Sequence, residues 1–229
     1  MSYFLHIDTA IVSASVCLSF NEDVVGFLSN PLQKDSASWI QTGIRELMQN
    51  AGVKLQLLKA VSVSAGPGSY TGLRVGMATA KGLCYALNIP LITINTLKMM
   101  VVAAQNEDAE LFCPMIDARR MEVFTAVYDK RLKEIIVPQN IVLDDKSFCE
   151  ILETKKILFF GNGSNKFQEL IKSQNALFKK IEADAKHLVT QSIEAFKNQI
   201  FADVAYCEPF YGKAFYSPAI QSFRHKNKI

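Results

Sequence analysis

The sequence predicts an α/β protein built from two lobes of similar construction. The first 28 residues contain short apolar and alternating runs that are typical of antiparallel strands. From about residue 36, apolar strands alternate with helical patterns, which is the order of βα units. Because the second half repeats this combination more loosely, we expect two α/β lobes rather than one continuous sheet.

Apolar spacing and turn residues place the elements of the first half. The predicted strands are 3–9, 14–20, 24–28, 60–65 and 90–94. The predicted helices are 36–50, 71–87 and 96–105. Asp35 or Ser36 can cap the first of these helices, and Gly52 marks its end.

The second half gives four strands and three helices. The predicted strands are 111–116, 122–128, 135–142 and 156–160, and the helices are 145–152, 166–172 and 187–201. The charged segment 106–110 is the first polar break, so we place an N-terminal lobe in 1–106 and a C-terminal lobe with a basic tail in 107–229. Whether that tail packs back on the first lobe stays open.

Composition limits the class of protein. The 229 residues carry 25 Lys and Arg against 22 Asp and Glu, and 49% hydrophobic residues exclude a disordered chain. No Lys or Arg precedes Lys34, so the basic region of a signal peptide is missing. The most apolar stretch, 82–97, falls short of the roughly 20 apolar residues that a bilayer requires. We expect a soluble cytoplasmic protein without membrane contact.

Neither the five cysteines nor the basic tail indicates a functional site in the sequence. No two cysteines have the spacing of a metal site or redox motif, so buried reduced thiols are expected. The positive excess lies in 209–229, which contain no acid. A nucleic-acid contact would use such charges, but a solvated terminus is favoured. The basic residues concerned are Lys213, Arg224, Lys226 and Lys228.

The most informative segment joins a predicted strand to a predicted helix and reads Gly66-Pro67-Gly68-Ser69-Tyr70-Thr71-Gly72. Free N–H groups at a helix start attract anions, which makes this turn a candidate phosphate cradle. It lacks the lysine of a P-loop, and its third glycine comes one residue too late for a dinucleotide fingerprint. We therefore favour a tight structural turn, with Ser69 or Thr71 as the helix cap.

The helix after this turn carries small residues four apart, Gly72, Gly76 and Ala80. Glycine inside a helix costs roughly 1 kcal/mol relative to alanine, so another backbone is expected to approach closely. That backbone belongs either to the chain's own sheet or to a second subunit, and the spacing leaves both open. An apolar stripe shares this helix and consists of Leu73, Met77, Ala80, Cys84 and Leu87.

Catalytic patterns are scarce. The three histidines, His6, His187 and His225, form no metal-binding pair, and no nucleophile elbow is present, so no catalytic residue or metal ligand is predicted. Asp8 ends the first strand, where a turn residue is favoured over a metal ligand. The charged cluster between two later strands, with Asp117, Arg119, Arg120 and Glu122, favours ion pairing with an arginine over catalysis.

Several of these segments occur together, in order, in a known family. They are Ile7-Asp-Thr-Ala10, Ala65-Gly-Pro-Gly-Ser-Tyr-Thr-Gly-Leu-Arg-Val-Gly76, Lys81-Gly-Leu83, Ile94-Asn-Thr-Leu97 and Ile116-Asp-Ala-Arg119. With them the chain resembles the TsaB family, also called YeaZ. The resemblance is dense from residue 3 to about 128 and thin afterwards.

The resemblance implies an actin-like, sugar-kinase-like ATPase fold with two ribonuclease-H-like lobes. It also implies a part in making N6-threonylcarbamoyladenosine in tRNA, as a non-catalytic scaffold or activator without a cofactor. In that family the protein dimerises with its catalytic paralogue TsaD, and the ATPase TsaE joins the pair. We expect homodimers when the partner is absent, and only indirect contact with tRNA.

The family's subunit contact is a helix bundle, here built from helices 36–50 and 71–87. This favours the second-subunit interpretation of the glycine stripe. The predicted interface residues are Trp39, Ile40, Gly43, Leu47, Gly72, Leu73, Gly76, Met77 and Ala80. The predicted structural motif consists of Asp8, Gly66, Pro67, Gly68, Ser69, Thr71, Arg74, Asp117 and Arg119.

Two departures support a non-catalytic role. Residues 35–40 lack the paired histidines with which TsaD-like members hold a metal, and Asp8 is followed by Thr9-Ala10 where kinase relatives have a phosphate-binding glycine. The alternative is an autonomous metal-dependent hydrolase of the glycoprotease type, or an ATP-dependent phosphotransferase.

Overall fold

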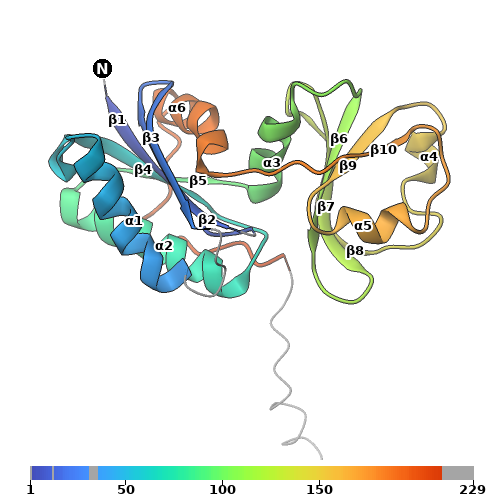
Figure 1. Cartoon of the computed structure of the whole chain (residues 1–229), viewed down its shortest axis with the longest axis horizontal. Helices are drawn as coiled ribbons and strands as arrows, with labels where there is room; N and C mark the ends of the chain where they lie inside the picture. The colour runs from blue at the N-terminus through green and yellow to red at the C-terminus, as the bar shows by residue number, and fades with distance from the viewer. Residues whose placement is uncertain (1, 12, 31–35, 213–229) are drawn as a thin grey trace, which may run out of the picture.

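The protein has two lobes, each built on one five-stranded sheet (Figure 1). The computed structural model describes residues 2–11, 13–30 and 36–212. The basic tail 213–229 and the proposed cap at Asp35 therefore lie outside the described residues. None of the described helices is both long and apolar enough to span a bilayer.

The sheet of the N-terminal lobe has the strand order β3-β2-β1-β4-β5. Its strands are β1 (Tyr3–Asp8), β2 (Ala14–Phe20), β3 (Asp23–Asn30), β4 (Leu58–Ser64) and β5 (Leu91–Ile94). β1 pairs antiparallel with β2 and parallel with β4, so it lies at the centre of the sheet. Burial on both faces explains why β1 and β4 are almost continuously apolar or small.

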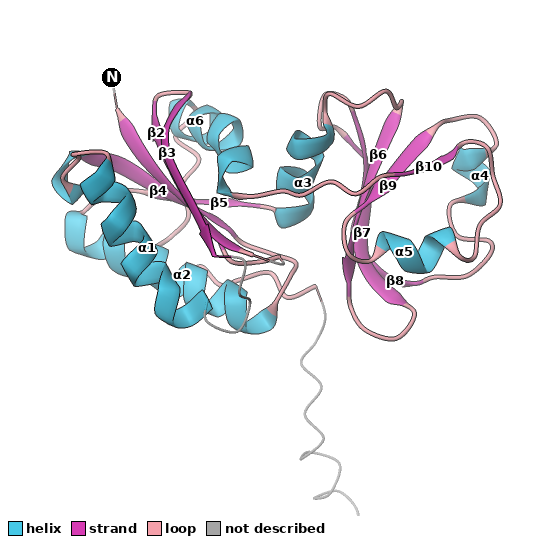
Figure 2. Cartoon of the chain, in the orientation of Figure 1, coloured by secondary structure: helices cyan, strands magenta, loops and turns pink. Residues whose placement is uncertain are grey.

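Helices cover both faces of this sheet (Figure 2). The helices α1 (Ser36–Asn50) and α2 (Tyr70–Leu87) pack on one face, over a core that includes Leu5, Ile7 and Val16. On the other face lie the short helix η3 (Ala185–Leu188) and α6 (Val189–Lys197). Gly52 follows α1 with φ +65°, as its predicted place after the helix end requires.

The second sheet repeats the strand order of the first, as β8-β7-β6-β9-β10. Its strands are β6 (Leu111–Asp117), β7 (Glu122–Asp129), β8 (Glu134–Val142), β9 (Ile157–Phe160) and β10 (Ala176–Phe178). In each lobe three antiparallel strands are followed by two parallel ones, which is the ribonuclease-H-like arrangement. The predicted two-lobe α/β fold is confirmed.

The helices of the second lobe are shorter than the periodicity predicts. The expected helix 145–152 is reduced to α4 (Cys149–Leu152), because turns occupy the preceding residues. The expected helix 166–172 lies earlier, as α5 (Ser164–Gln168). The remaining elements are η2 (Leu55–Leu57), before β4, and α3 (Thr96–Ala104), which packs on β6 and on η3 between the lobes.

After β10 the chain returns to the first lobe, so residues 107–229 differ from the single lobe that the sequence predicts. Residues 185–197 pack against the N-terminal sheet through Ala185, Leu188, Val189 and Ile193. Ala202 then forms a bridge to Leu91 at the edge of that sheet. We call residues 202–212 the strap. The C-terminal lobe is therefore an insertion between α3 and η3, and 107–229 is not one unit.

Candidate partner-binding face

The glycine turn between β4 and α2 is filled by the chain's own backbone. The N–H of Ser69 donates to the carbonyl of Ala10 at 2.7 Å, and a Cβ at Gly68 would collide with that carbonyl. The N–H of Phe210, in the strap, donates to the Ala65 carbonyl at 2.7 Å. Neighbouring segments therefore occupy this turn, as the structural interpretation expects.

Ser69 begins α2 by accepting a hydrogen bond from the Gly72 N–H at 3.3 Å, so it is the cap that the sequence left open between Ser69 and Thr71. Thr71 is exposed on the first turn of the helix. Gly66 and Pro67 pack against the strap, where a Cβ at Gly66 would strike the carbonyl of Phe210.

The small-residue stripe of α2 faces inward, which contradicts its predicted place at a subunit interface. A Cβ at Gly72 would collide with the carbonyl of Thr9, and one at Gly76 with the Thr9 hydroxyl. That hydroxyl donates to the Gly72 carbonyl at 2.7 Å. The two glycines therefore accommodate Thr9, the residue that follows β1 in the same chain.

The other predicted interface residues are also covered by their own lobe. Five of them are buried, between 0% and 3% exposed, and all but Leu73 belong to the core under α1 and α2: Ile40, Leu47, Leu73, Met77 and Ala80. Trp39 is half-buried and lies over Gly43, where a Cβ would be 2.8 Å from the indole ring. The predicted interface residues therefore lie on the inner faces of α1 and α2.

The outer face of α2 carries a different set of small and apolar residues. Val75, Ala78, Gly82 and Tyr85 recur at spacings of three and four, so they share one side of the helix. Tyr85 is 85% exposed, and a Cβ at Gly82 would meet open space. We call these four residues the outer stripe. The spacing of the outer stripe can be read from the sequence, but the apolar stripe on the other side of the helix is longer and gives the stronger pattern.

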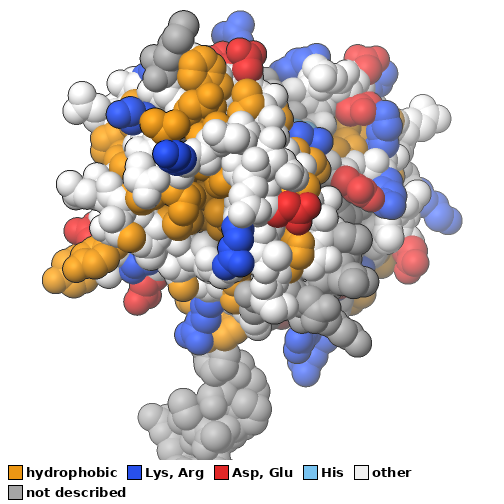
Figure 3. All heavy atoms as spheres, turned by 60° about the vertical axis from the view of Figure 1, so that its left-hand side comes forward, with side chains coloured by type: hydrophobic (Ala, Val, Ile, Leu, Met, Phe, Trp, Pro, Cys, Tyr) orange, Lys and Arg blue, Asp and Glu red, His pale blue; other side chains and the backbone are white. Residues whose placement is uncertain are grey.

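A groove of about 500 Å³ is lined by α1, by residues 52–55 that follow it, and by Leu83 of α2, which is next to Gly82 of the outer stripe in the sequence. Leu83 forms its α2 wall, and Ile44 and Met48 its α1 wall. Gln41 and Arg45 border it with polar groups, and Gln41 donates to Thr79 at 3.1 Å. Figure 3, which brings this side of the molecule forward, shows apolar side chains spread among polar ones across the face.

The strap extends this face along one flank of α2. The ammonium of Lys81 donates to the carbonyls of Ala205 and Cys207, both at 3.1 Å. At the start of the helix, the Arg74 guanidinium stacks over Tyr70 at 4.3 Å and donates to the Tyr211 hydroxyl at 3.1 Å. Arg74 is therefore a structural link between the strap and α2.

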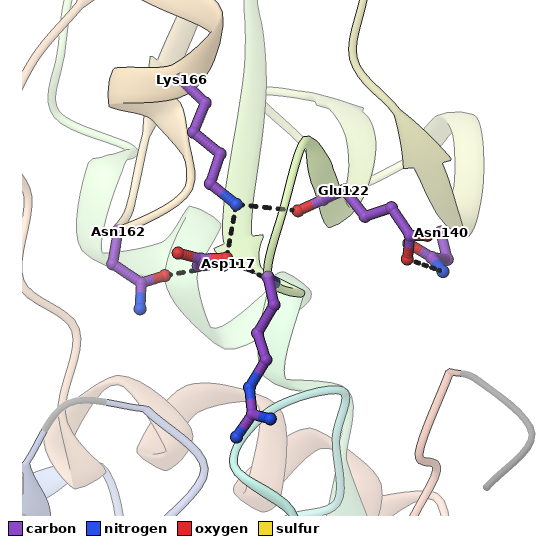
Figure 4. A network of polar contacts seen from close by, with 6 residues as sticks. Asp117, Glu122, Asn140, Asn162 and Lys166 are labelled. Carbon is purple, nitrogen blue, oxygen red and sulfur yellow. Dashed lines mark hydrogen bonds and ion pairs between the residues drawn. The ribbon is translucent and has the colours of Figure 1, made fainter. Parts of the chain in front are cut away.

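The charged cluster around Asp117 in the second lobe joins the end of β6 to α5 (Figure 4). Lys166 reaches from α5 to Asp117 at 2.6 Å, so the ion pair is made with a lysine and not with the predicted arginine. Arg119 supplies only its backbone N–H, at 2.6 Å. Although partial burial acts to raise the pKa of Asp117, these two bonds outweigh it and hold that pKa below its usual value.

Asp8 and His6 are buried polar residues on the face of β1 that is turned away from α1 and α2. Burial raises the pKa of Asp8 to about 6, although Ser64 and the Ala10 N–H donate to one carboxylate oxygen. The other oxygen, Oδ2, is buried without a hydrogen-bond partner. Burial lowers the pKa of His6 to about 3, so the ring that lies between Ser62 and Ser19 is neutral.

Among the described residues, no three His, Cys, Asp or Glu side chains gather as a metal site would require. The five cysteines are unpaired; Cys17, Cys84 and Cys113 are buried, whereas Cys149 and Cys207 are partly exposed. The prediction of buried thiols is therefore right for three of the five.

Comparison with known proteins agrees with this architecture. The family model described as TsaD, tRNA N6-adenosine threonylcarbamoyltransferase, matches residues 19–209. The tRNA threonylcarbamoyladenosine biosynthesis protein TsaB of Bacillus subtilis is 29% identical over 214 residues, which are 90% of this chain and 92% of the relative. The TsaB protein of Escherichia coli is 32% identical over 127 residues, 55% of this chain and 54% of the relative. The chain belongs to the TsaD-related TsaB (YeaZ) family.

Solved structures show the same fold in this family. A Pseudomonas aeruginosa protein described as similar to peptidase YeaZ has a TM-score of 0.83 at 22% identity, covering 93% of this chain and all of that one. YeaZ from Pseudomonas aeruginosa has a TM-score of 0.76 at 22% identity, covering 92% and 100%. The chain is also similar to a tRNA N6-adenosine threonylcarbamoyltransferase of Legionella pneumophila, which is 32% identical over 91 residues, 40% of this chain and 27% of the transferase.

Proposed function

We propose that this chain is a non-catalytic subunit of the apparatus that forms N6-threonylcarbamoyladenosine in tRNA, and that its partner is a TsaD-like transferase. The observation that carries the proposal is the outer stripe on α2, where small residues and an 85% exposed tyrosine adjoin an open groove. Exposed apolar surface next to a groove is typical of protein interfaces.

The surface suits a helix as its occupant. Ala78 and Gly82 have short side chains or none, so a partner backbone can approach α2 closely there. Leu83, Ile44 and Met48 then offer the groove for a large apolar side chain of that helix. The sequence that TsaB shares with TsaD supports a pseudo-symmetric pair in which similar helices meet.

Further partners follow from the same assembly. A TsaE-like ATPase joins the pair, tRNA is contacted through the catalytic subunit, and the free chain forms homodimers through the outer stripe. In this assembly the chain orients and activates the transferase and supplies no reacting group.

The test is association with the TsaD homologue of the same organism. Ala78→Arg and Gly82→Arg place a large charged side chain on the outer stripe, at positions exposed to solvent. We expect each to weaken binding roughly 30-fold or more, measured by calorimetry, since an interface centre tolerates an unpaired charge poorly. Gln139→Arg, on exposed β8 in the other lobe, is the matched control and should bind like wild type.

Two results would contradict the proposal. One is wild-type affinity in both outer-stripe variants. The other is hydrolase activity, or ATP turnover by the isolated chain, that is indifferent to the added TsaD homologue.

A further inference from the structure

The edge strand β8 presents a row of exposed apolar side chains on the second lobe. Ile135, Val137 and Val142 are 47%, 63% and 64% exposed, although isoleucine and valine are among the residues most often buried. Three such side chains along one strand form a patch, and apolar patches on a protein surface commonly mark a place where another segment binds. We call these three residues the β8 row.

The β8 row lies on the face of the second sheet that is turned away from α4 and α5. Ile136 and Ile141 pack into the core on the α4–α5 side. Each residue of the row is next to one of these two isoleucines in the sequence, so its side chain is turned to the opposite face. On β7 that opposite face carries Phe124, Ala126 and Tyr128, which belong to the core beneath α3.

The described part of the chain ends beside this face. Its last residue is Gly212 in the strap, where a Cβ would lie 2.7 Å from Cε1 of Phe124. Phe124 pairs in register with Asn140 of β8, and Val142, two residues further along β8, is its diagonal neighbour on the same face. The strap therefore crosses from the first lobe to the second, and residues 213–229 begin next to the β8 row.

Residues 213–229 have the length and the composition to cover the row. They can span at most about 56 Å when extended, whereas the nine residues of β8 extend over about 30 Å. Burial of these side chains against the row removes apolar surface of both from water, which is the main source of stability in such a contact. The larger apolar side chains of the segment include Phe215, Tyr216, Ile220 and Phe223.

The distribution of charge favours the same placement. Glu122 and Glu134 lie near the two ends of the β8 row, since they pair in register with Val142 and with Tyr128. Residues 213–229 contain no acid, so cations laid along the row approach carboxylates at both of its ends. The basic residues of the segment are Lys213, Arg224, Lys226 and Lys228.

We propose that residues 213–229 bind to the β8 row of the same chain, with Phe215, Ile220 and Phe223 as the side chains that cover it. The end of the chain then belongs to the second lobe, and its positive charge lies on that lobe. The β8 row is separate from the outer stripe, so this proposal holds or fails independently of the TsaD-like partner.

Photocross-linking of the full-length chain tests the contact directly. The variant Val137→p-benzoylphenylalanine places a photoreactive ring in the middle of the row, at a position that is already exposed. After irradiation, mass spectrometry should find this residue joined to a peptide within 213–229, in a product with the mass of one chain. The matched control is Val25→p-benzoylphenylalanine on the edge strand β3 of the other lobe, which should give no such product.

Changes in the tail test which side chains make the contact. Phe215→Ser, Ile220→Ser and Phe223→Ser, combined in the photoreactive chain, should abolish the cross-link, whereas Gln221→Ser should leave it unchanged. A cross-link that survives the triple change would overturn the assignment of these side chains. Absence of any cross-link from position 137, or a product with the mass of two chains, would overturn the proposal itself, the latter because a second copy would then occupy the row. Far-ultraviolet circular dichroism verifies that every variant is folded.

Discussion

The side chain of Thr9 occupies the space that a Cβ at position 76 would need. The same hydroxyl donates to the Gly72 carbonyl at 2.7 Å, so one threonine directly after β1 contacts two glycines of α2. The absence of side chains at these two positions is thus a condition for packing α2 on its own sheet. A partner that binds α2 must use the opposite side of the helix.

Gly76→Ala should therefore destabilise the isolated chain. The added methyl group displaces Thr9, and overpacking of this kind costs about 1–3 kcal/mol of the free energy of unfolding. Gly82→Ala on the same helix meets open space and should stabilise the chain by about 1 kcal/mol. Urea denaturation measures both. A Gly76 variant that unfolds like wild type but loses its partner would restore the interface interpretation.

The buried pair His6 and Asp8 predicts a compensated dependence of stability on pH. Between pH 3.8 and about 6, folded Asp8 keeps a proton that the unfolded chain releases, so stability falls as pH rises. Between about 3 and 6.5, unfolded His6 binds a proton that the folded chain excludes, so stability rises with pH. Where the two windows overlap, these slopes oppose each other.

Asp8→Asn should remove the fall in the free energy of unfolding with rising pH that Asp8 causes, and leave the rise that His6 causes. The amide oxygen can still accept from Ser64 and Ala10, so the variant keeps its hydrogen bonds. Its stability should rise between pH 4 and 6 by about 1.4 kcal/mol per pH unit relative to wild type. At pH 7 it should exceed wild type by up to about 3 kcal/mol, because no carboxylate is buried. Parallel stability curves for the two proteins, from urea denaturation across this range, would refute the account.

The hairpin between β6 and β7 predicts a local gain from glycine. Arg119 and Arg120 have φ values of 70° and 50°, a conformation that glycine adopts without strain. Arg120→Gly should raise the free energy of unfolding by about 1 kcal/mol, whereas Asp117→Asn should lower it by a similar amount because it weakens the bond to Lys166. Thermal denaturation compares the two, and destabilisation by Arg120→Gly would show that its side chain holds the turn.

Burial also predicts which thiols react. Burial raises the pKa of Cys17 and Cys113 to about 12 and that of Cys84 to about 11, so few thiolates form there at pH 8. Alkylation of the native chain, read by mass spectrometry, should label the partly exposed Cys149 and Cys207. The other three should react only after unfolding. Rapid labelling of Cys113 in the native chain would contradict the packing of the second lobe.

The sequence was sufficient for elements with strong periodicity. Helices α1 and α2 begin and end within one residue of their predicted bounds, because caps and glycines mark them. The weakly periodic helices of the second lobe were displaced, and β10 was missed because three residues carry too little pattern. Local signals also could not show that α6 returns to the first sheet, since that contact joins residues far apart in the chain.

For the candidate partner-binding face as well, local sequence patterns did not show how the elements pack. Spacing identifies a helix with two non-polar sides, but only tertiary packing decides which side is covered. Gly72 and Gly76 have the composition expected of an interface and lie inside, while Ala78 and Gly82 lie outside. A cavity of about 700 Å³ between the lobes has no sequence signal, because its lining comes from five separate segments.

The insertion of one lobe into the other sets an order on biosynthesis. A ribosome releases β6 to β10 as a complete sheet while the first sheet still lacks α6 and the strap, whose residues are translated afterwards. Until those last segments emerge, Phe4, Ile92 and their neighbours have no cover on one face. The lobe that is begun first is therefore finished last, and a nascent chain stalled near residue 180 should depend on chaperones to a degree that the released protein does not.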